Sequence, residues 1–186
     1  MVDRKASVIV LAEDVQMRSF IRRFLKGLNF DTTNKYRDAD FPPGQGSGEQ
    51  RVRELLLREL VAYRGRVAKG YKGFHLLIVL TDADQLTVRE RRRQLEEEIK
   101  TAGVGPLRPD EDVAILIPRR NIETWIYFLN SKAVDETSSY RKLMKPSDCK
   151  EAVSRLVELY RSDRPLPDDL PDSLRVGIEE LRRVVG

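Results

Sequence analysis

The feature that most constrains the fold is an alternation of short apolar runs with longer stretches of helical periodicity. Three runs, at residues 8–12, 76–80 and 113–117, are continuously apolar, which is the pattern of strands buried on both faces, and the second of these strands is predicted to start at residue 74. Residues 30–35 form a second, weaker candidate strand after the first run. Strands separated by helices of this length imply βαβ units with right-handed crossovers. The pattern therefore predicts an α/β fold, a parallel sheet flanked by helices on both faces.

The first predicted helix follows the first strand. Apolar residues at three- and four-residue spacing favour a helix over residues 17–28, and Gly27 and Asn29 mark its end. A loop rich in glycine and proline is expected from about residue 37 to 48. This loop separates the first strand–helix unit from the next helix.

Two further helices are predicted from their first residues. Ser47 with Gln50 and Thr87 with Glu90 each fit a capping box, in which the two residues satisfy one another's backbone amides. The second of these helices is highly charged and is expected to end near Lys100. Another helix, with Trp125 facing the core, is predicted after the last strand.

The C-terminal part of the chain shows no strand pattern. Two amphipathic helices are predicted around residues 152–160 and 174–184, joined by a proline-punctuated connector. Some 55 residues are too few to bury a core of their own. We therefore predict an α/β domain over residues 1–130 and a helical extension over residues 131–186 that packs on it.

Several kinds of chemistry are excluded by composition. His75 is the only histidine and Cys149 is the only cysteine among 186 residues. An internal disulfide, a cysteine zinc site, a multi-histidine metal site and a Ser-His-Asp triad are therefore excluded. Hydrolytic chemistry in this chain must rest on carboxylates, arginines and lysines.

The sequence predicts a soluble cytoplasmic protein with no membrane association. No apolar run approaches the roughly 18 residues needed to cross a bilayer, and the N-terminus lacks the apolar core of a secretory signal. The chain carries 24 Arg against 10 Lys and a net charge of +4. Arginine suits phosphate oxygens, which favours a nucleic-acid or nucleotide partner, although a coding bias toward arginine is an equal alternative. Arg119 and Arg120, which follow the last strand, are candidates for touching phosphate rather than solvent.

Acidic residues stand at the carboxyl ends of three predicted strands. Glu13 and Asp14 follow the first strand, Asp82 and Asp84 follow the strand at 74–80, and Glu123 opens the last predicted helix of the sheet domain. Ligands of open parallel sheets bind at this edge, and Mg²⁺ is commonly held by one or two carboxylates plus substrate phosphates. Each acid alone is more often a turn former or helix cap, but together they predict a shared metal site.

The charged segment at residues 89–100 has two interpretations. Its arginines resemble a nucleic-acid-binding stripe, yet Arg92 with Glu96 and Arg93 with Glu97 are neighbours at i,i+4 on a helix. A solvated, ion-paired face is therefore the favoured interpretation.

The motifs also resemble a family. The apolar strand ending in Glu (VIVLAED) and the later strand ending in Asp-x-Asp (LLIVLTDAD) look like the Toprim domain of topoisomerases, primases and OLD-family nucleases. The segments IPRRNIETWIYFL and DSLRVGIEELRRVV resemble small bacterial Toprim-like proteins found beside AAA or SMC-like ATPases in phage-defence loci. The resemblance implies a Toprim-like fold and a Mg²⁺- or Mn²⁺-dependent nuclease with an ATPase partner. It assigns Glu13, Asp82 and Asp84 as catalytic metal ligands, and Glu123 as a fourth candidate.

The chain departs from this family at two positions. Met17 stands where OLD-like members commonly have a second Glu, and Leu86 stands where topoisomerase members can extend the Asp run. We therefore expect weak metal affinity, and little activity without a partner. Two alternatives remain open: a non-catalytic Toprim-fold binding subunit, and a receiver-like domain with Glu13 and Asp14 as its acidic pair and Asp82 as its phosphoacceptor.

Overall fold

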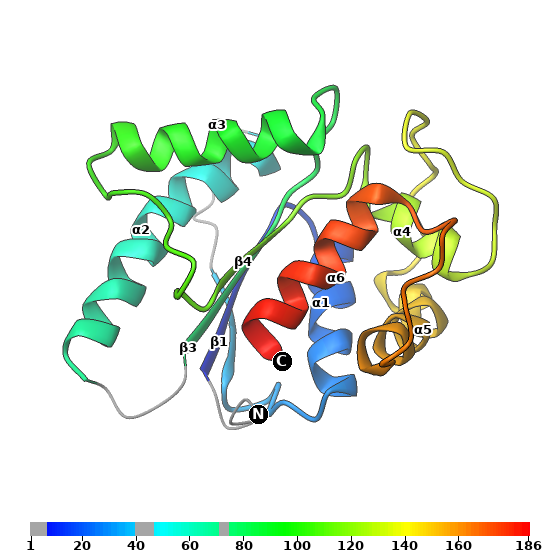
Figure 1. The fold of residues 1–186 in the computed structure, drawn as a ribbon, viewed down its shortest axis with the longest axis horizontal. Helices are drawn as coiled ribbons and strands as arrows, with labels where there is room; N and C mark the ends of the chain where they lie inside the picture. The colour runs from blue at the N-terminus through cyan, green and yellow to red at the C-terminus, as the bar shows by residue number, and fades with distance from the viewer. Residues whose placement is uncertain (1–6, 40–46, 71–74) are drawn as a thin grey trace.

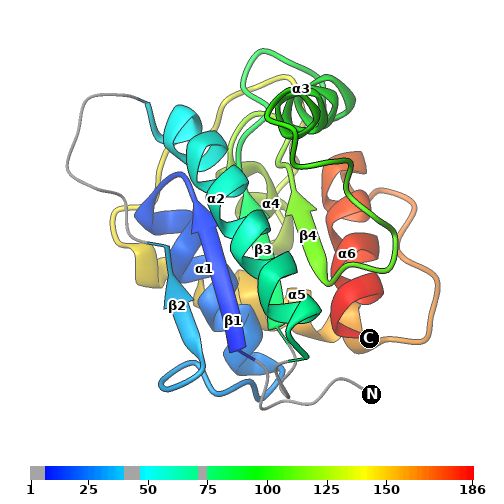
Figure 2. The same ribbon diagram turned by 90° about the vertical axis from the view of Figure 1, so that its left-hand side faces the viewer.

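The computed structural model describes residues 7–39, 47–70 and 75–186. Its centre is a four-stranded sheet in which all neighbouring strands are parallel, in the order β2-β1-β3-β4 (Figure 2). The strands are β1 (Ser7–Ala12), β2 (Tyr36–Asp38), β3 (His75–Leu80) and β4 (Val113–Leu116). The predicted α/β class is confirmed.

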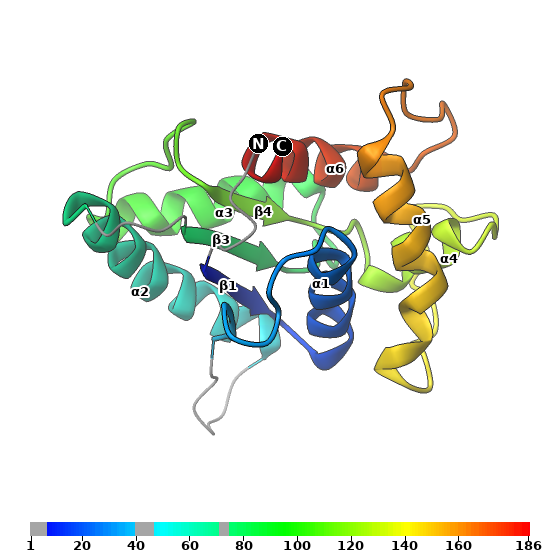
Figure 3. The same cartoon turned by 90° about the horizontal axis from the view of Figure 1, so that it is seen from below.

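Helices cover both faces of the sheet (Figures 1 and 3). Their bounds are α1 (Val15–Gly27), α2 (Gly48–Ala68), α3 (Val88–Thr101), α4 (Ile122–Leu129), α5 (Lys150–Arg161) and α6 (Asp172–Val185), with a 3₁₀ turn at Pro146–Cys149. Helices α2 and α3 pack on the face to which Ile9 and Leu11 point. Helices α1, α4, α5 and α6 pack on the opposite face, to which Val8 and Val10 point. Successive side chains of a strand point to opposite faces of the sheet. Because helices cover both faces, apolar residues are buried at every position of these strands.

Helices α5 and α6 share the core of the sheet face that α1 covers. Trp125 of α4 is buried, and its indole nitrogen donates a hydrogen bond to Ser173 Oγ at 2.7 Å. The α6 backbone approaches the same ring so closely that a Cβ on Gly177 would lie 2.7 Å from it. The segment after residue 131 thus packs against α1, α4 and β4 rather than forming a separate core.

The second strand does not lie where the sequence pattern placed it. Residues 30–35 contain no strand but a turn at residues 32–34, and β2 begins only at Tyr36. The Asp31 carboxylate accepts hydrogen bonds from the backbone amides of Thr33 and Asn34, each at 3.0 Å, and Asn29 adopts a left-handed conformation with φ 67°. This local turn chemistry outweighs the β-propensity of the segment.

The predicted glycine- and proline-rich loop starts later than expected, because residues 37 and 38 belong to β2. Residues 40–46 of that loop, and Phe74 at the start of the strand predicted at residues 74–80, lie outside the described residues.

Of the two predicted capping boxes, one forms completely. Thr87 and Glu90 satisfy one another's backbone amides at the start of α3. Ser47 accepts from the Gln50 amide, but the Gln50 side chain donates to Glu54 instead of returning to Ser47. Within the described ranges, no helix combines the length and the apolarity that a membrane span requires.

Candidate metal site at the carboxyl edge of the sheet

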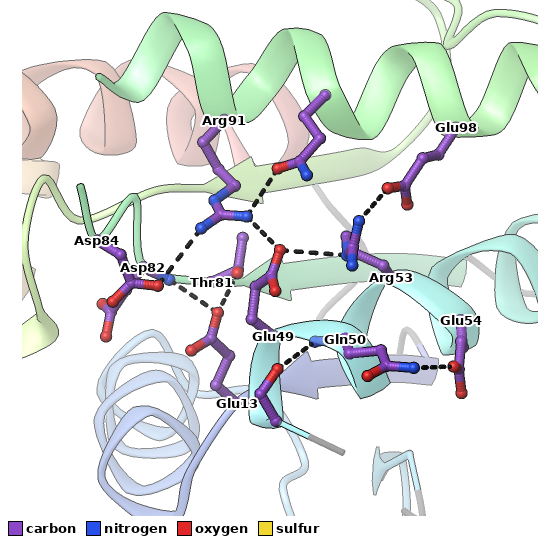
Figure 4. A network of polar contacts seen from close by, with 12 residues as sticks. Glu13, Glu49, Gln50, Arg53, Glu54, Thr81, Asp82, Asp84, Arg91 and Glu98 are labelled. Carbon is purple, nitrogen blue, oxygen red and sulfur yellow. Dashed lines mark hydrogen bonds and ion pairs between the residues drawn. The ribbon is translucent and has the colours of Figure 1, made fainter. Parts of the chain in front are cut away.

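The carboxyl ends of β1 and β3 bring Glu13 and Asp82 side by side. The two strands are adjacent and parallel, and their register pairs Ala12 with Leu80. Glu13 Oε1 accepts hydrogen bonds from the Thr81 hydroxyl and from the backbone amide of Asp82, the latter at 3.1 Å (Figure 4). Strand connections change direction between β1 and β3, and open α/β sheets bind their ligands in the crevice at such a point.

The carboxylates at this edge share one electrostatic environment. Burial raises the pKa of Glu13 to about 7, although the Thr81 hydrogen bond opposes the shift. Burial also raises the pKa of Asp82 well above its usual value, and repulsion from four carboxylates adds to it, those of Glu13, Asp84, Asp14 and Glu123. Asp82 Oδ1 is buried without a hydrogen-bond partner. The other four acids that the sequence singles out thus all act electrostatically on Asp82, and Glu13 is also joined to it by a hydrogen bond.

Asp84 lies at the exposed rim of this edge. Its side chain is 57% exposed, and its Oδ2 lies 3.4 Å from Nη2 of Arg91 on α3. Its backbone has φ 54°, a left-handed conformation that is uncommon outside glycine and tolerated by Asp. The Asp84 carbonyl accepts a hydrogen bond from Arg120 at 2.7 Å, and Arg119 donates to the carbonyl of Leu86. Arg119 and Arg120, the two arginines predicted to touch phosphate, therefore each donate at least one guanidinium hydrogen bond to the backbone of the β3–α3 loop.

Glu123 is the most deeply buried of the five acids. It lies in the first turn of α4, is 1% exposed, and its Oε1 has no hydrogen-bond partner. Burial raises the pKa of Glu123, and repulsion from Asp14 adds to the shift. The two carboxylate oxygens of Asp14 have different partners. Its Oδ1 caps α1 by accepting from Met17, and its Oδ2 lies 3.0 Å from Nζ of Lys142.

Lys142 was missed by sequence reasoning. It lies in the irregular segment between α4 and α5, and its ammonium is electrostatically coupled to Glu123 and Asp82 as well as hydrogen-bonded to Asp14. No local pattern marks it, because its partner Asp14 stands 128 positions earlier in the chain.

An ion-pair chain joining α2 and α3 to the site was also missed. Arg91 is buried and pairs with Glu49 in the first turn of α2, and Glu49 in turn lies 3.1 Å from Nε of Arg53 (Figure 4). The start of α2 touches the site directly, since a Cβ on Gly48 would lie 2.8 Å from the backbone oxygen of Glu13. Glycine is therefore required at the first residue of this helix.

The charged face of α3 is ion-paired, as predicted, but only one of its two expected pairs forms. Arg92 lies 3.1 Å from Glu96 and 2.5 Å from Glu180 of α6. The predicted Arg93–Glu97 pair is wrong, because Glu97 lies 3.9 Å from Lys100, one turn further along the helix.

The acids at the edge do not form a complete metal cage by themselves. Within residues 7–39, 47–70 and 75–186, no three His, Cys, Asp or Glu side chains form a group that could hold a metal ion. Mg²⁺ does not require such a cage, because it is commonly bound through one or two carboxylates together with water and substrate phosphates. Glu13 and Asp82 fit that donor set, since Asp82 keeps a buried oxygen with no protein partner.

Comparison with known proteins found no match. No protein-family model matches the chain, and neither a curated protein nor a solved structure matches it. The α/β class and the contact between Glu13 and Asp82 rest on the structure, whereas the family resemblance rests on the motifs themselves and stays a prediction.

Proposed function

We propose that the edge formed by β1 and β3 is the Mg²⁺ or Mn²⁺ site of a Toprim-like nuclease that acts on phosphodiester bonds of DNA or RNA. The observation that carries the proposal is the environment of the Asp82 carboxylate. Its carboxylate is held beside Glu13 at the switch point of the sheet, one of its oxygens is buried without a partner, and no Lys or Arg of the described residues forms an ion pair with either acid. Such uncompensated acids cluster at functional sites.

The residues of the edge would have distinct roles. Glu13 and Asp82 would hold the cation, and the Thr81 hydroxyl would fix the orientation of Glu13. Asp84, held at the rim by Arg91, and Glu123 would not complete a cage of ligands but would add negative charge around the cation. When bound, a divalent cation would polarise the phosphodiester and lower the pKa of an attacking water.

We further propose that the nuclease works in the cytoplasm with an ATPase partner, in phage defence. One feature of the chain supports this part of the proposal. Met17 stands where a second acid is common in OLD-like proteins. It is buried in the core, so this position supplies no carboxylate to the site. The set of acids is therefore small, and a partner that contributes basic residues would raise the population of a competent site.

A receiver-like phosphoacceptor is the second candidate. The strand order β2-β1-β3-β4 is part of the 2-1-3-4-5 order of flavodoxin-like folds, and Asp82 follows β3 beside the acidic pair that follows β1. In this alternative Asp82 attacks the phosphorus of acetyl phosphate, forms an acyl phosphate and releases acetate. Covalent labelling of Asp82 by acetyl phosphate would favour it over the nuclease.

The nuclease assay uses the purified full chain with Mn²⁺ on supercoiled plasmid and on labelled RNA, with and without a candidate ATPase. Glu13→Gln and Asp82→Asn are each expected to lower cleavage at least 100-fold, and EDTA is expected to abolish it. Asp110→Asn is the matched control, because it removes an exposed carboxylate at the opposite end of β4. Equal cleavage by all three variants would contradict the proposal. Silence of the wild type in every combination would favour the non-catalytic binding subunit.

A further inference from the structure

A second charged feature lies along α1, outside the acid cluster. A cleft of about 450 Å³ runs between this helix and the turn before β2. It is lined by four basic side chains, one carboxylate and three hydroxyl groups: Arg18, Arg22, Arg23, Lys26, Asp38, Ser19, Thr32 and Thr33.

Three of the basic residues form a row along α1 and do not converge on one point. Arg18, Arg22 and Lys26 follow one another at intervals of four residues and so share one face of α1. Each interval advances about 6 Å along the axis, which gives a row of about 12 Å. The row begins one turn after Asp14, the cap of α1, whose charge is felt by Asp82.

The acids near this row already have partners. The Asp38 carboxylate accepts from the Tyr36 hydroxyl at 2.6 Å, and the Asp31 carboxylate is used by its own turn. Neither Arg22 nor Lys26 forms an ion pair with a described carboxylate. The cleft therefore keeps an excess of positive charge, unlike the surroundings of Arg91 and Arg92 on α3, which are both ion-paired.

Part of the row is also held in position. Arg22 Nη2 donates to the carbonyl of Thr32 at 3.0 Å, and its guanidinium lies 5.2 Å from the centre of the Tyr36 ring. Arg23 Nε is buried without a hydrogen-bond partner. A preorganised guanidinium with unused donors suits recognition of phosphate oxygens.

We propose that this cleft binds consecutive phosphates of one nucleic-acid strand and leads that strand to the acid cluster. The identity of the strand as substrate rests on the proposed function, whereas the binding itself does not. Cations spread over about 12 Å can contact consecutive phosphates of one strand, because those phosphates are also spread along a line. A free phosphate ion would instead need cations that converge on one point.

The test measures binding of a fluorescent 12-nucleotide single strand by anisotropy, in EDTA and at several salt concentrations, so that cation binding and cleavage play no part. Wild type is compared with Arg18→Gln/Lys26→Gln. The matched control is Arg89→Gln/Arg93→Gln, which removes the same charge from exposed positions of α3. Arg22 is left intact because it also supports the turn at Thr32.

The α1 double variant is expected to bind at least 10-fold more weakly, with the slope of log K against log salt reduced by about 1.4, because each lost contact to a single strand removes about 0.7. The α3 variant is expected to bind as the wild type does. Equal losses in the two variants, or none in either, would overturn the proposal. Competition by inorganic phosphate at millimolar concentration as effective as competition by unlabelled strand would also overturn it, in favour of a site for a free anion.

Discussion

Two buried glutamates lie near opposite ends of β4, and their pKa values are shifted in opposite directions. Glu111, just before the strand, is 3% exposed, and Glu123, after it, is 1% exposed. Glu111 accepts hydrogen bonds from Arg64 at 2.6 and 3.0 Å and from the Arg108 amide at 2.9 Å. Burial alone would raise its pKa, but the Arg64 contacts outweigh burial and hold the pKa below its usual value. The pKa of Glu123 is raised, and one of its oxygens has no partner.

The comparison separates buried acids that have an arginine partner from buried acids that have none among the described residues. At the amino end of the sheet a buried carboxylate is compensated by a two-point arginine contact, so the charge belongs to the fold. At the carboxyl end, no described Lys or Arg forms an ion pair with Glu13, Asp82 or Glu123, and the pKa of each of the three is raised. The fold tolerates this repulsion, and we infer that a ligand outside the chain, a divalent cation, relieves it.

The largest effect is expected at the compensated end. Arg64→Met leaves Glu111 buried without its principal partner, and breaking a buried pair in this way costs about 3 to 5 kcal/mol. Urea denaturation at pH 7 measures the loss in the free energy of unfolding. A loss below 1 kcal/mol would break the comparison, because Glu111 would then need no compensation.

The next effect concerns pH. Because the folded-state pKa of Glu13 is about 7 and its ordinary value is 4.5, the folded protein holds this proton more tightly than the unfolded chain does. Its contribution to stability is therefore full below pH 4.5 and is lost as pH rises through 7, by about 2 kcal/mol once partial exposure is allowed for. Glu13→Gln should flatten this part of the stability–pH curve in EDTA. An unchanged slope would mean that Glu13 titrates normally.

A smaller effect is expected for Asp82→Asn. Removing one of several repelling carboxylates should raise the free energy of unfolding by about 1 kcal/mol at pH 8 without metal, and the gain should shrink toward pH 5 as the wild-type carboxyl protonates. Urea denaturation at the two pH values gives the difference. A loss of 2 kcal/mol or more at pH 8 would make Asp82 a structural acid like Glu111.

The sequence was sufficient for the features that depend on local pattern. The buried strands at β1, β3 and β4 are continuous apolar runs, and the acids that follow them meet because parallel strands end at one edge. The prediction of a strand at residues 30–35 was wrong, because the side chain of Asp31 stabilises a turn there. That competition between propensity and turn chemistry is decided by a few hydrogen bonds and is hard to foresee.

The features beyond local pattern are pairings across the chain. Arg64 meets Glu111 over 47 positions, and Arg91 meets Glu49 over 42. The sequence contains many acids and many arginines, so nothing in it states which of them neutralise each other. The same uncertainty hid the difference between α1 and α3, which are both rich in arginine but differ in the carboxylates that face them.

The central claim is that the uncompensated acids form a cation site, and direct Mn²⁺ binding to the full chain tests it. Electron paramagnetic resonance of free Mn²⁺ at pH 7.5 should show saturable binding to the wild type, at least 10-fold weaker binding to Asp82→Asn, and unchanged binding to Asp110→Asn at the other end of β4. Binding that is equal in all three proteins, or absent from the wild type at millimolar Mn²⁺, would contradict the account.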